Sequence, residues 1–316
     1  MTSRETVREV INPDELSARI AAALGRRYRL TRLGVKCTYP VFKGEVDGAS
    51  PVFVKVGTRE EWTRTADLLK AIDDCEFFSR FLTDAPIAFN GSAVFVMEWR
   101  ESKTVFPEDM TERQIESFVA GCVKLGKVLE CVRVSAGRGD RDGTGNSPEA
   151  LYGDILQYVY RHRVAGRALR GLVEIPEVER TYGAHPRAVC HGDFHAKNFG
   201  FAGDEFAAVY DFDKLTEGLR CSDLVNALCE RFSCHHLSRA ARRRLEDVSR
   251  RIVARAPWPR EELSIACNVV RLQFAARRIR KHPDSAWVAL DVLRRDRAIR
   301  GFLACCNASR DGNLIY

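Results

Sequence analysis

The sequence predicts an α+β protein of two lobes, a small β-rich N-terminal lobe over residues 1–98 and a larger helical C-terminal lobe over residues 99–316. Three observations lead to this prediction. Strand-like and helix-like patterns alternate in the first hundred residues, whereas helical periodicity dominates afterwards. A polar, strand-rich stretch at residues 187–212 interrupts the helices. The length of 316 residues and the hydrophobic content of 45% suit one large domain or two modest ones.

A β-hairpin is the main element expected in the N-terminal lobe. In "PVFVKV" (51–56) three valines alternate with Phe53 and Lys55, and the turn-forming "DGAS" joins this segment to "PVFKGEV" (40–46). Alternation of this kind on both sides of a turn is typical of paired strands. The other elements expected in this lobe are helices at residues 13–25 and 59–82 and strands at residues 28–35 and 92–99.

The C-terminal lobe is expected to consist mainly of helices. Residues 111–132 begin with a capping-box pattern, Thr111 and Gln114, and continue with an apolar stripe at helical spacing, so they are expected to form a core helix. The segment 135–148 is rich in Gly and charge and is expected to be a linker. A second helix is expected near residues 149–169, and further helices from residue 212 to about residue 306.

Composition narrows the classes of protein that fit. The sequence has no uncharged apolar run of membrane-spanning length and no apolar segment in its charged first twenty residues, so a cytoplasmic protein without a membrane partner is expected. Its 11 cysteines are an odd number and include no C-x-x-C pair, which favours reduced core thiols over disulfides. A zinc site at Cys229, Cys234, His235 and His236 is disfavoured because the ligand spacing is wrong.

The positive charge is unevenly distributed along the chain. Residues 1–98 carry 14 basic and 14 acidic side chains, so the whole excess of +7 lies in residues 99–316. Much of it is in the arginine-rich segments 238–256 and 271–281, where apolar residues recur at helical spacing. Solvated helix faces are therefore expected. Nucleic-acid binding is the alternative, but no motif combines basic and aromatic residues, and no nucleic-acid partner is expected.

The stretch "VCHGDFHAKNFGFAGDEFAAVYDFDK" (189–214) places many polar side chains among residues typical of buried strands. Burying carboxylates costs several kcal/mol unless a partner compensates. Two short strands joined at Gly203 and Asp204 would bring Asn198 opposite Asp211. An amide oxygen beside a carboxylate suits Mg²⁺, which takes few protein ligands together with phosphates. Asp193, five residues before Asn198, is then free to accept a proton.

This order of Asp, Asn and Asp is what phosphoryl transfer requires. With His191, Gly192, Asp193, His195 and Asn198, the chain resembles the aminoglycoside phosphotransferase and choline kinase superfamily, whose catalytic loop reads H-G-D-x-H-x-x-N. The resemblance implies a protein-kinase-like fold with the active site in a cleft. It implies that Asp193 is the catalytic base, that Asn198 and Asp211 bind Mg²⁺, and that the histidines brace the loop.

The resemblance also extends to "CSDLVNAL" (221–228), which is similar to the start of a helix in the same family. It implies that Asp223 braces the catalytic loop and caps that helix. Lys197 stands at a position that is often small in the family, and a solvated lysine is expected there.

The N-terminal lobe would supply the nucleotide site. Lys55 lies in a strand, as the phosphate-binding lysine of a kinase-like lobe does, and Glu76 in the following helix is its expected ion-pair partner, with Asp73 and Asp74 as competitors. The segment "VFVMEWRE" resembles the hinge of the family, with the backbone of Glu98 and Trp99 near the adenine. The segment 34–44 departs from the kinase pattern because it contains no G-x-G-x-x-G.

The expected function is ATP- and Mg²⁺-dependent transfer of the γ-phosphate to a hydroxyl group of a small molecule. A catalytically silent pseudokinase that binds nucleotide and acts as an interaction module is the alternative, disfavoured because Asp193, Asn198 and Asp211 occur together. A protein kinase is disfavoured because neither H-R-D nor an A-P-E-like segment is present. The positive excess of the C-terminal lobe favours a neutral or anionic acceptor over a polycationic one.

Overall fold

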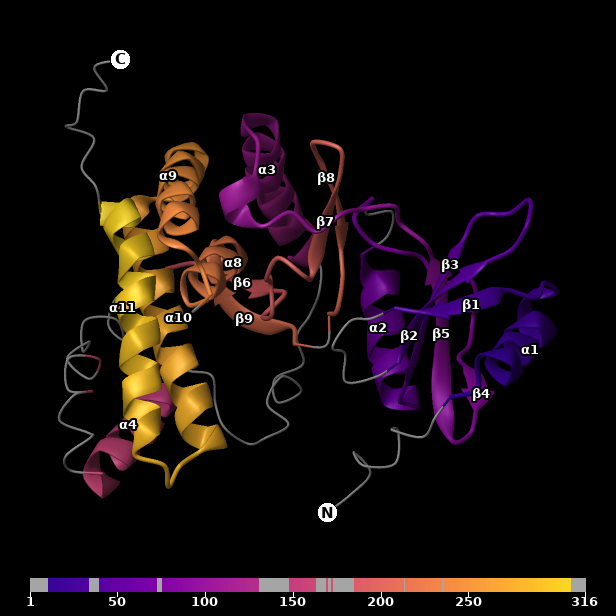
Figure 1. Cartoon of the computed structure of the whole chain (residues 1–316), viewed down its shortest axis with the longest axis horizontal. Coiled ribbons are helices and arrows are strands. Elements are labelled where there is room, and N and C mark those ends of the chain that lie inside the picture. Colours follow the sequence, from indigo (N-terminus) through magenta and orange to yellow (C-terminus); the bar gives the residue numbers. More distant parts are fainter. Residues whose placement is uncertain are drawn as a thin grey trace. The chain divides into compact units, whose positions relative to one another are not determined.

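A computed structural model of the chain, drawn in Figure 1, describes residues 11–33, 40–72, 76–130, 148–162, 169, 172, 185–212, 214–234 and 236–307. The chain divides into two compact units. Unit 1 comprises Met1–Ser102 and Ala207–Val209, and unit 2 comprises Lys103–Phe206 and Tyr210–Tyr316. A β-sheet occupies the N-terminal part and helices dominate the C-terminal part, which confirms the predicted α+β fold class.

Unit 1 is built on a five-stranded antiparallel sheet with the strand order β1-β2-β3-β5-β4. The predicted hairpin is present, and Val41 of β2 pairs with Lys55 of β3. One face of the sheet is apolar because alternate residues of β3 are buried against the first helix. The elements of this unit are α1 (Pro13–Leu24), β1 (Arg29–Arg32), β2 (Val41–Glu45), β3 (Val52–Gly57), α2 (Arg59–Ala71), β4 (Ile87–Phe89) and β5 (Ser92–Glu98).

Helix α2 is shorter than predicted. A capping box at Thr58 and Glu61 starts it, but it ends at Ala71 with Ile72 as its cap, instead of reaching residue 82. Asp73 and Asp74 follow directly in the sequence, and negative charge at a helix C-terminus opposes the helix dipole. The sequence predicted that Glu76 lies within this helix. In the structure it lies after the end of the helix.

Unit 2 combines helices with the small sheet β6-β9 and with β7 of the small sheet β7-β8, whose strand β8 ends in Ala207–Val209 of unit 1 (Figure 1). The predicted core helix is present as α3, with the capping box at Thr111 and Gln114. The predicted helix near residues 149–169 is described only as far as Arg161, and most of the predicted linker lies outside the described residues. The elements are η2 (Pro107–Asp109), α3 (Glu112–Leu129), α4 (Pro148–Arg161), β6 (Arg187–Cys190), β7 (Phe199–Ala202), β8 (Glu205–Val209), β9 (Thr216–Leu219), α8 (Ser222–Phe232), α9 (Arg239–Arg255), α10 (Arg260–Lys281) and α11 (Trp287–Asn307).

The arginine-rich helix α9 uses its charges within unit 2. Arg251 and Arg255 both pair with Glu112 at the start of α3, and Arg244 pairs with Asp109 of η2 at 3.4 Å. These arginines thus join α9 to α3 and η2, which goes beyond the solvated face expected from the sequence.

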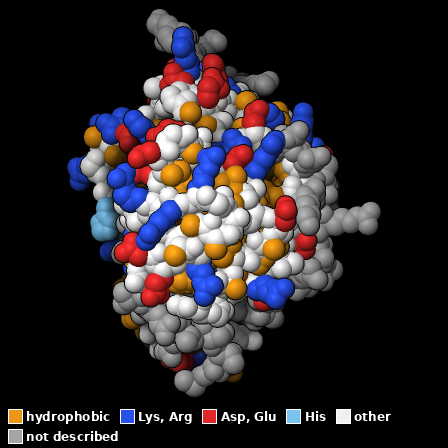
Figure 2. Space-filling model, turned by 90° about the vertical axis from the view of Figure 1, so that its right-hand side faces the viewer, with side chains coloured by type: hydrophobic (Ala, Val, Ile, Leu, Met, Phe, Trp, Pro, Cys, Tyr) orange, Lys and Arg blue, Asp and Glu red, His pale blue; other side chains and the backbone are white. Residues whose placement is uncertain are grey.

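On the face of the protein in Figure 2, basic and acidic side chains are interspersed with scattered hydrophobic ones.

The cysteines of the described residues are all free, and all of them except Cys234 are buried. Burial raises the pKa of Cys122 well above its ordinary value, so this thiol stays protonated and unreactive. The Sγ atoms of Cys229 and Cys267 lie 3.7 Å apart as a thiol contact. Within the described ranges, no helix has an apolar stretch long enough to cross a bilayer.

Candidate active site

The loop between β6 and β7 is held by a buried carboxylate of α8. Asp223 accepts hydrogen bonds from the backbone N–H groups of His191 at 2.8 Å and Gly192 at 3.2 Å. Burial raises the pKa of Asp223, although the nearby His191 ring and these two donors oppose the shift. The carboxylate therefore takes the place of water as the hydrogen-bond acceptor for two backbone N–H groups of the loop. These contacts fit the predicted bracing role of Asp223.

The predicted capping role of Asp223 is wrong. The N-cap of α8 is Cys221, which makes no side-chain cap hydrogen bond, and Asp223 lies in the first turn of the helix. Its carboxylate oxygens are instead occupied by the loop. A negative charge in the first turn still interacts favourably with the helix dipole.

Gly192 has a backbone conformation that the loop requires. Its φ is +76°, and a Cβ atom built on it would lie 2.0 Å from the carbonyl oxygen of Lys214. The left-handed region is accessible to glycine without steric cost, and no larger residue fits at this distance. Gly192 therefore allows the chain after β8 to pass directly against the loop.

His191 is fully buried beneath the loop. Its Nε2 lies 2.7 Å from the carbonyl oxygen of Tyr210, and its ring packs against Phe194 and Phe212. Burial lowers the pKa of His191, so the ring is neutral near neutral pH and donates its proton to that carbonyl. These contacts fit the bracing role that the resemblance implies.

Asp193 presents a mostly buried carboxylate, with 18% of its side chain exposed. The ammonium group of Lys214 lies 2.6 Å from its Oδ2, and His195 Nε2 lies 4.0 Å from the same oxygen. Burial raises the pKa of Asp193, but Lys214, His195 and Arg277 together outweigh it and lower the pKa below its ordinary value. Asp193 is thus ionised at neutral pH and can accept a hydrogen bond or a proton.

Asn198 and Asp211 lie at the open end of the β7-β8 hairpin. Asn198 is buried. Its side-chain Nδ2 donates a hydrogen bond to the backbone carbonyl of Asp193 at 2.9 Å, and its backbone carbonyl accepts one from the N–H of Tyr210 at 2.8 Å. The partner of Asn198 across the hairpin is thus Tyr210 and not Asp211, so the predicted pairing is displaced by one residue, although the turn lies at Gly203 and Asp204 as predicted.

Asp211 has a φ of +63°, a conformation that is uncommon for a residue with a side chain. Strained backbone of this kind persists where the surroundings hold it, and it is frequent at functional sites. Asp211 directly follows Tyr210, which is bonded to Asn198, so the amide and the carboxylate belong to adjacent positions at the base of one hairpin.

The donor set fits magnesium better than zinc. Among the described residues, no three His, Cys, Asp or Glu side chains form a group that could hold a metal ion. Asn198 and Asp211 offer one amide oxygen and one carboxylate, both hard ligands. Two protein ligands are too few for a structural metal, but they suit Mg²⁺ bound mainly by phosphates and water.

The loop between β6 and β7 and the hairpin rest on an aromatic cluster formed by Phe118, Phe194, Phe199 and Phe206. Phe118 and Phe199 have ring centroids 5.1 Å apart, and both side chains are fully buried. The tip of the hairpin is bound by α3, where Gln114 donates to the carbonyl of Gly203 and the hydroxyl of Ser117 accepts from the N–H of Phe206. The site therefore has a rigid base in unit 2.

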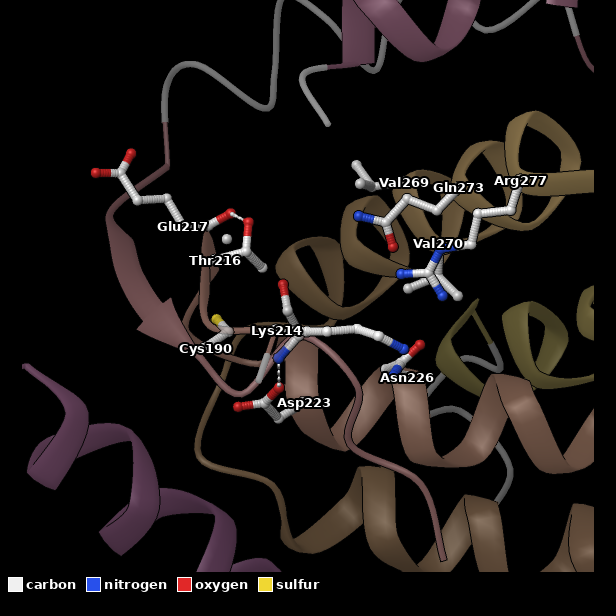
Figure 3. Close-up of a pocket in the computed structure, with 13 residues that line it drawn as sticks. Cys190, Lys214, Thr216, Glu217, Asp223, Asn226, Val269, Val270, Gln273 and Arg277 are labelled. Atoms are coloured by element: carbon white, nitrogen blue, oxygen red, sulfur yellow. Dashed lines mark hydrogen bonds between the residues drawn. The ribbon is translucent and has the colours of Figure 1, made fainter. Parts of the chain in front are cut away.

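A cavity of about 120 Å³ lies beside the loop within unit 2 (Figure 3). One wall consists of Gly192, Lys214 and β9, and the other is the face of α10. Figure 3 shows Gln273 and Arg277 extending from α10 toward Lys214 and Asn226. The cavity thus adjoins the lysine that binds the Asp193 carboxylate.

The predicted nucleotide-binding residues belong to unit 1. Lys55 lies in the middle of β3, paired with Phe95 of β5, and its ammonium lies 5.8 Å from the centroid of that aromatic ring. Glu76 is exposed, and its carbonyl oxygen accepts a hydrogen bond from Arg100. The ion pair between Lys55 and Glu76 stays a prediction.

Glu98 ends β5, and Trp99 follows it. The N–H of Glu98 donates to the carbonyl of Arg80 at 2.9 Å, and that of Trp99 donates to the carbonyl of Pro51 at 3.3 Å. Both donors are engaged within unit 1, so an adenine base would have to use other groups of this segment. The hinge assignment of these two residues also stays a prediction.

Two side chains of the site were missed by the sequence analysis. Lys214 and Arg277 act on Asp193 from positions 21 and 84 residues farther along the chain. Lys214 directly follows the triplet "DFD", and this position next to the motif could have indicated that the lysine belongs to the site. Arg277 gave no signal, because it is one of many arginines in its helix. Lys197 is exposed, as expected.

One comparison with known proteins identifies the family of the chain. A family model described as "Phosphotransferase enzyme family" matches residues 46–261. Similar solved structures include the amicoumacin kinase hAmiN in complex with AMP-PNP, Ca²⁺ and Ami, with 12% identity, a TM-score of 0.58, and coverage of 91% of this chain and 93% of that one.

Two aminoglycoside phosphotransferases have similar folds. A thermostable mutant of APH(4)-Ia with ADP and hygromycin B has 13% identity and a TM-score of 0.58, covering 91% of this chain and 98% of that one. ADP-bound APH(2'')-Ib has 13% identity and a TM-score of 0.55, covering 92% of this chain and 98% of that one. A search of curated proteins finds no significant match. Identities this low show the fold alone.

Proposed function

Since the chain belongs to the phosphotransferase enzyme family, we propose that it is a kinase that transfers the γ-phosphate of ATP to a hydroxyl group of a small molecule, with Mg²⁺ as its metal. The observation that carries this proposal is the arrangement of the catalytic loop. The loop presents the ionised carboxylate of Asp193. The same loop carries Asn198, whose backbone carbonyl accepts a hydrogen bond from Tyr210, the residue before Asp211.

In the proposed reaction, Asp193 orients the acceptor hydroxyl and receives its proton. The hydroxyl oxygen forms a bond to the γ-phosphorus while the bond from that phosphorus to the bridging oxygen of ADP breaks, so the products are the phosphate ester and ADP. The depressed pKa of Asp193 makes it a weak base, which suits a reaction whose proton leaves late. Positioning of the hydroxyl is then the main contribution of this residue.

Asn198 and Asp211 would hold Mg²⁺ on the nucleotide phosphates, where the metal neutralises negative charge that develops during the transfer. Asn198 is already fixed by its bonds to Asp193 and Tyr210, so little ordering is needed when the metal binds. Lys55 and Glu76 are proposed to position the phosphates, and the segment of Glu98 and Trp99 is proposed to hold the adenine.

An ATP-consumption screen over alcohols, sugars, amino alcohols and antibiotics tests this function. The expected result is Mg²⁺-dependent formation of ADP that rises with at least one hydroxyl compound, together with a phosphorylated product in the mass spectrum. A catalytically silent pseudokinase is the second candidate. It would bind Mg·ATP but form no phosphorylated product with any member of the panel.

The first prediction concerns Lys55. Lys55→Ala is expected to raise the KM for ATP and to lower kcat, because an ammonium group that positions the phosphates stabilises both the bound nucleotide and the transition state. Steady-state kinetics with ATP as the varied substrate measures both effects. Lys127→Ala, which removes an exposed lysine from α3, is the control. Wild-type turnover in Lys55→Ala would contradict the assignment.

The second prediction concerns the lysine bound to the proposed base. Lys214→Met removes the positive charge 2.6 Å from Asp193, so the pKa of Asp193 should rise toward its ordinary value. Because the ionised form is the active one, the acidic limb of the pH profile of kcat should move to higher pH. Lys197→Met, which removes an exposed lysine from the loop that carries Asp193, should leave the limb in place. A limb that does not move in Lys214→Met would contradict the role of Asp193 as base.

A further inference from the structure

The cavity beside the catalytic loop has an unusual arginine. Three other arginines of α10 bind carboxylates, namely Arg271 with Asp296, Arg278 with Asp291 and Arg280 with Asp154. Arg277 lines the cavity, is exposed, and forms no ion pair with any carboxylate of the described residues. Its charge nevertheless contributes to the low pKa of Asp193, so the guanidinium acts electrostatically on the catalytic loop.

Lys214 supplies a second positive charge at the same cavity. It binds Asp193, but 59% of its side chain is exposed, so its ammonium can also reach a ligand in the cavity. Lysine has three donors on a flexible stem, and one of them suffices for the bond to Asp193. The cavity therefore combines a guanidinium and an ammonium beside the proposed base.

Three carboxylates of the described residues lie in or beside the cavity, and each already has a partner within the protein. Asp223 accepts from two backbone N–H groups, and Asp193 is paired with Lys214. Glu217 lies within 4.0 Å of Arg187, and its carboxylate points away from the other labelled side chains in Figure 3. None of these groups is placed to receive an ammonium group of an acceptor, whereas Arg277 is placed to receive an anion.

We propose that this cavity binds the acceptor and that the acceptor is a hydroxyl compound with a negative group, a carboxylate or a phosphate, held by Arg277 and Lys214. The inference rests on the proposed function and adds the substrate class to it. Asn226 and Gln273 offer neutral polar groups for hydroxyls of the same compound. A volume of about 120 Å³ is somewhat smaller than the roughly 150 Å³ of a cavity that binds benzene, so it suits the negative group of the acceptor and the few atoms next to it.

Calorimetric titration of the full chain, saturated with Mg·AMP-PNP, tests the inference independently of turnover. Gluconate, glucose and glucosamine are the probes, because they share a six-carbon skeleton and differ in charge. Gluconate is expected to bind more tightly than glucose, and glucosamine least. Glucose 6-phosphate in a parallel titration distinguishes a phosphate site from a carboxylate site. Arg277→Gln is expected to weaken binding of the preferred anion about tenfold, the scale of one lost charge-assisted hydrogen bond.

Arg243→Gln is the control, since it removes the same charge from an exposed position on α9 that does not line the cavity. It should leave all the affinities unchanged. Preference for glucosamine, no binding of either anion, or an Arg277→Gln variant that binds the anion as the wild type does would overturn the inference. So would a loss of Mg·AMP-PNP affinity in Arg277→Gln, because the arginine would then serve the nucleotide.

The two proposals fail in different ways. Anion binding that depends on Arg277, without phosphorylation of any hydroxyl compound, would keep the anion site and remove the kinase function. Phosphoryl transfer to hydroxyl compounds without any preference for negative charge would keep the kinase and remove the anion site.

Discussion

Asparagine in place of Asp193 is expected to lower kcat by about 10²-fold or more, the usual scale for the loss of a general base. The affinity for Mg·ATP is expected to stay near the wild-type value, because Asp193 is proposed to act on the acceptor and not on the metal. The fold should also persist. The variant leaves Lys214 without its carboxylate, but that ammonium is largely exposed and water can solvate it.

Asp211→Asn is the matched variant for this measurement. It also replaces one carboxylate by an amide, but it removes a negative ligand from the proposed metal site, so it should weaken Mg·ATP binding as well as stop turnover. Calorimetric titration with Mg·ATP and an assay of phosphoryl transfer are needed for both variants. Equal loss of nucleotide binding in both would contradict the role of Asp193. Unimpaired ATP consumption in Asp193→Asn would contradict the kinase mechanism.

Alanine in place of Gly192 is expected to destabilise the protein by about 3 kcal/mol or more and to abolish most of its activity. Two effects add. The left-handed backbone of Gly192 costs about 1–2 kcal/mol for a residue with a Cβ atom. The new Cβ would also lie 2.0 Å from the carbonyl oxygen of Lys214, so the backbone that carries this lysine must move away from the loop. Urea denaturation and kcat measure the two effects.

Gly203→Ala separates these contributions. Gly203 also has a positive φ, +63°, but no atom outside its neighbours lies within 4 Å of a Cβ built there. The control should therefore lose only about 1–2 kcal/mol and keep its activity. If Gly192→Ala were no less stable and no less active than Gly203→Ala, close contact between the loop and Lys214 would not be important.

The sequence predicted best the features that depend on neighbouring residues. The hairpin that contains Lys55, the capping box at Thr111 and the turn at Gly203 and Asp204 are all specified by short patterns. The resemblance of the loop from His191 to Asn198 to the family motif could be found for a similar reason, because its residues stand at fixed spacing in one segment. The contacts of Asp223 followed from the family resemblance.

Short sequence patterns did not predict the features that depend on tertiary packing. The register of the β7-β8 hairpin was displaced by one residue, since register depends on turn geometry and on which face packs on Phe118. The end of α2 was also misplaced, because its apolar spacing continues into residues that leave the helix. Arg277 reaches the site only because α10 packs against α8, and nothing near it in the sequence indicates this.

The attachment of the hairpin tip to α3 has a consequence for amide hydrogen exchange. The N–H of Phe206 is bonded to the hydroxyl of Ser117, and the carbonyl of Gly203 to the side chain of Gln114, so the tip cannot separate from α3 without losing both bonds. Exchange at Phe206 should then require an opening that also exposes Phe118, and it should be as slow as exchange in the middle of α3. The N–H of Tyr210, bonded to Asn198 at the other end of the hairpin, should exchange in the same opening event. The end of the hairpin that carries Asn198 and Asp211 would thus form a single cooperative unit of local unfolding with the helix.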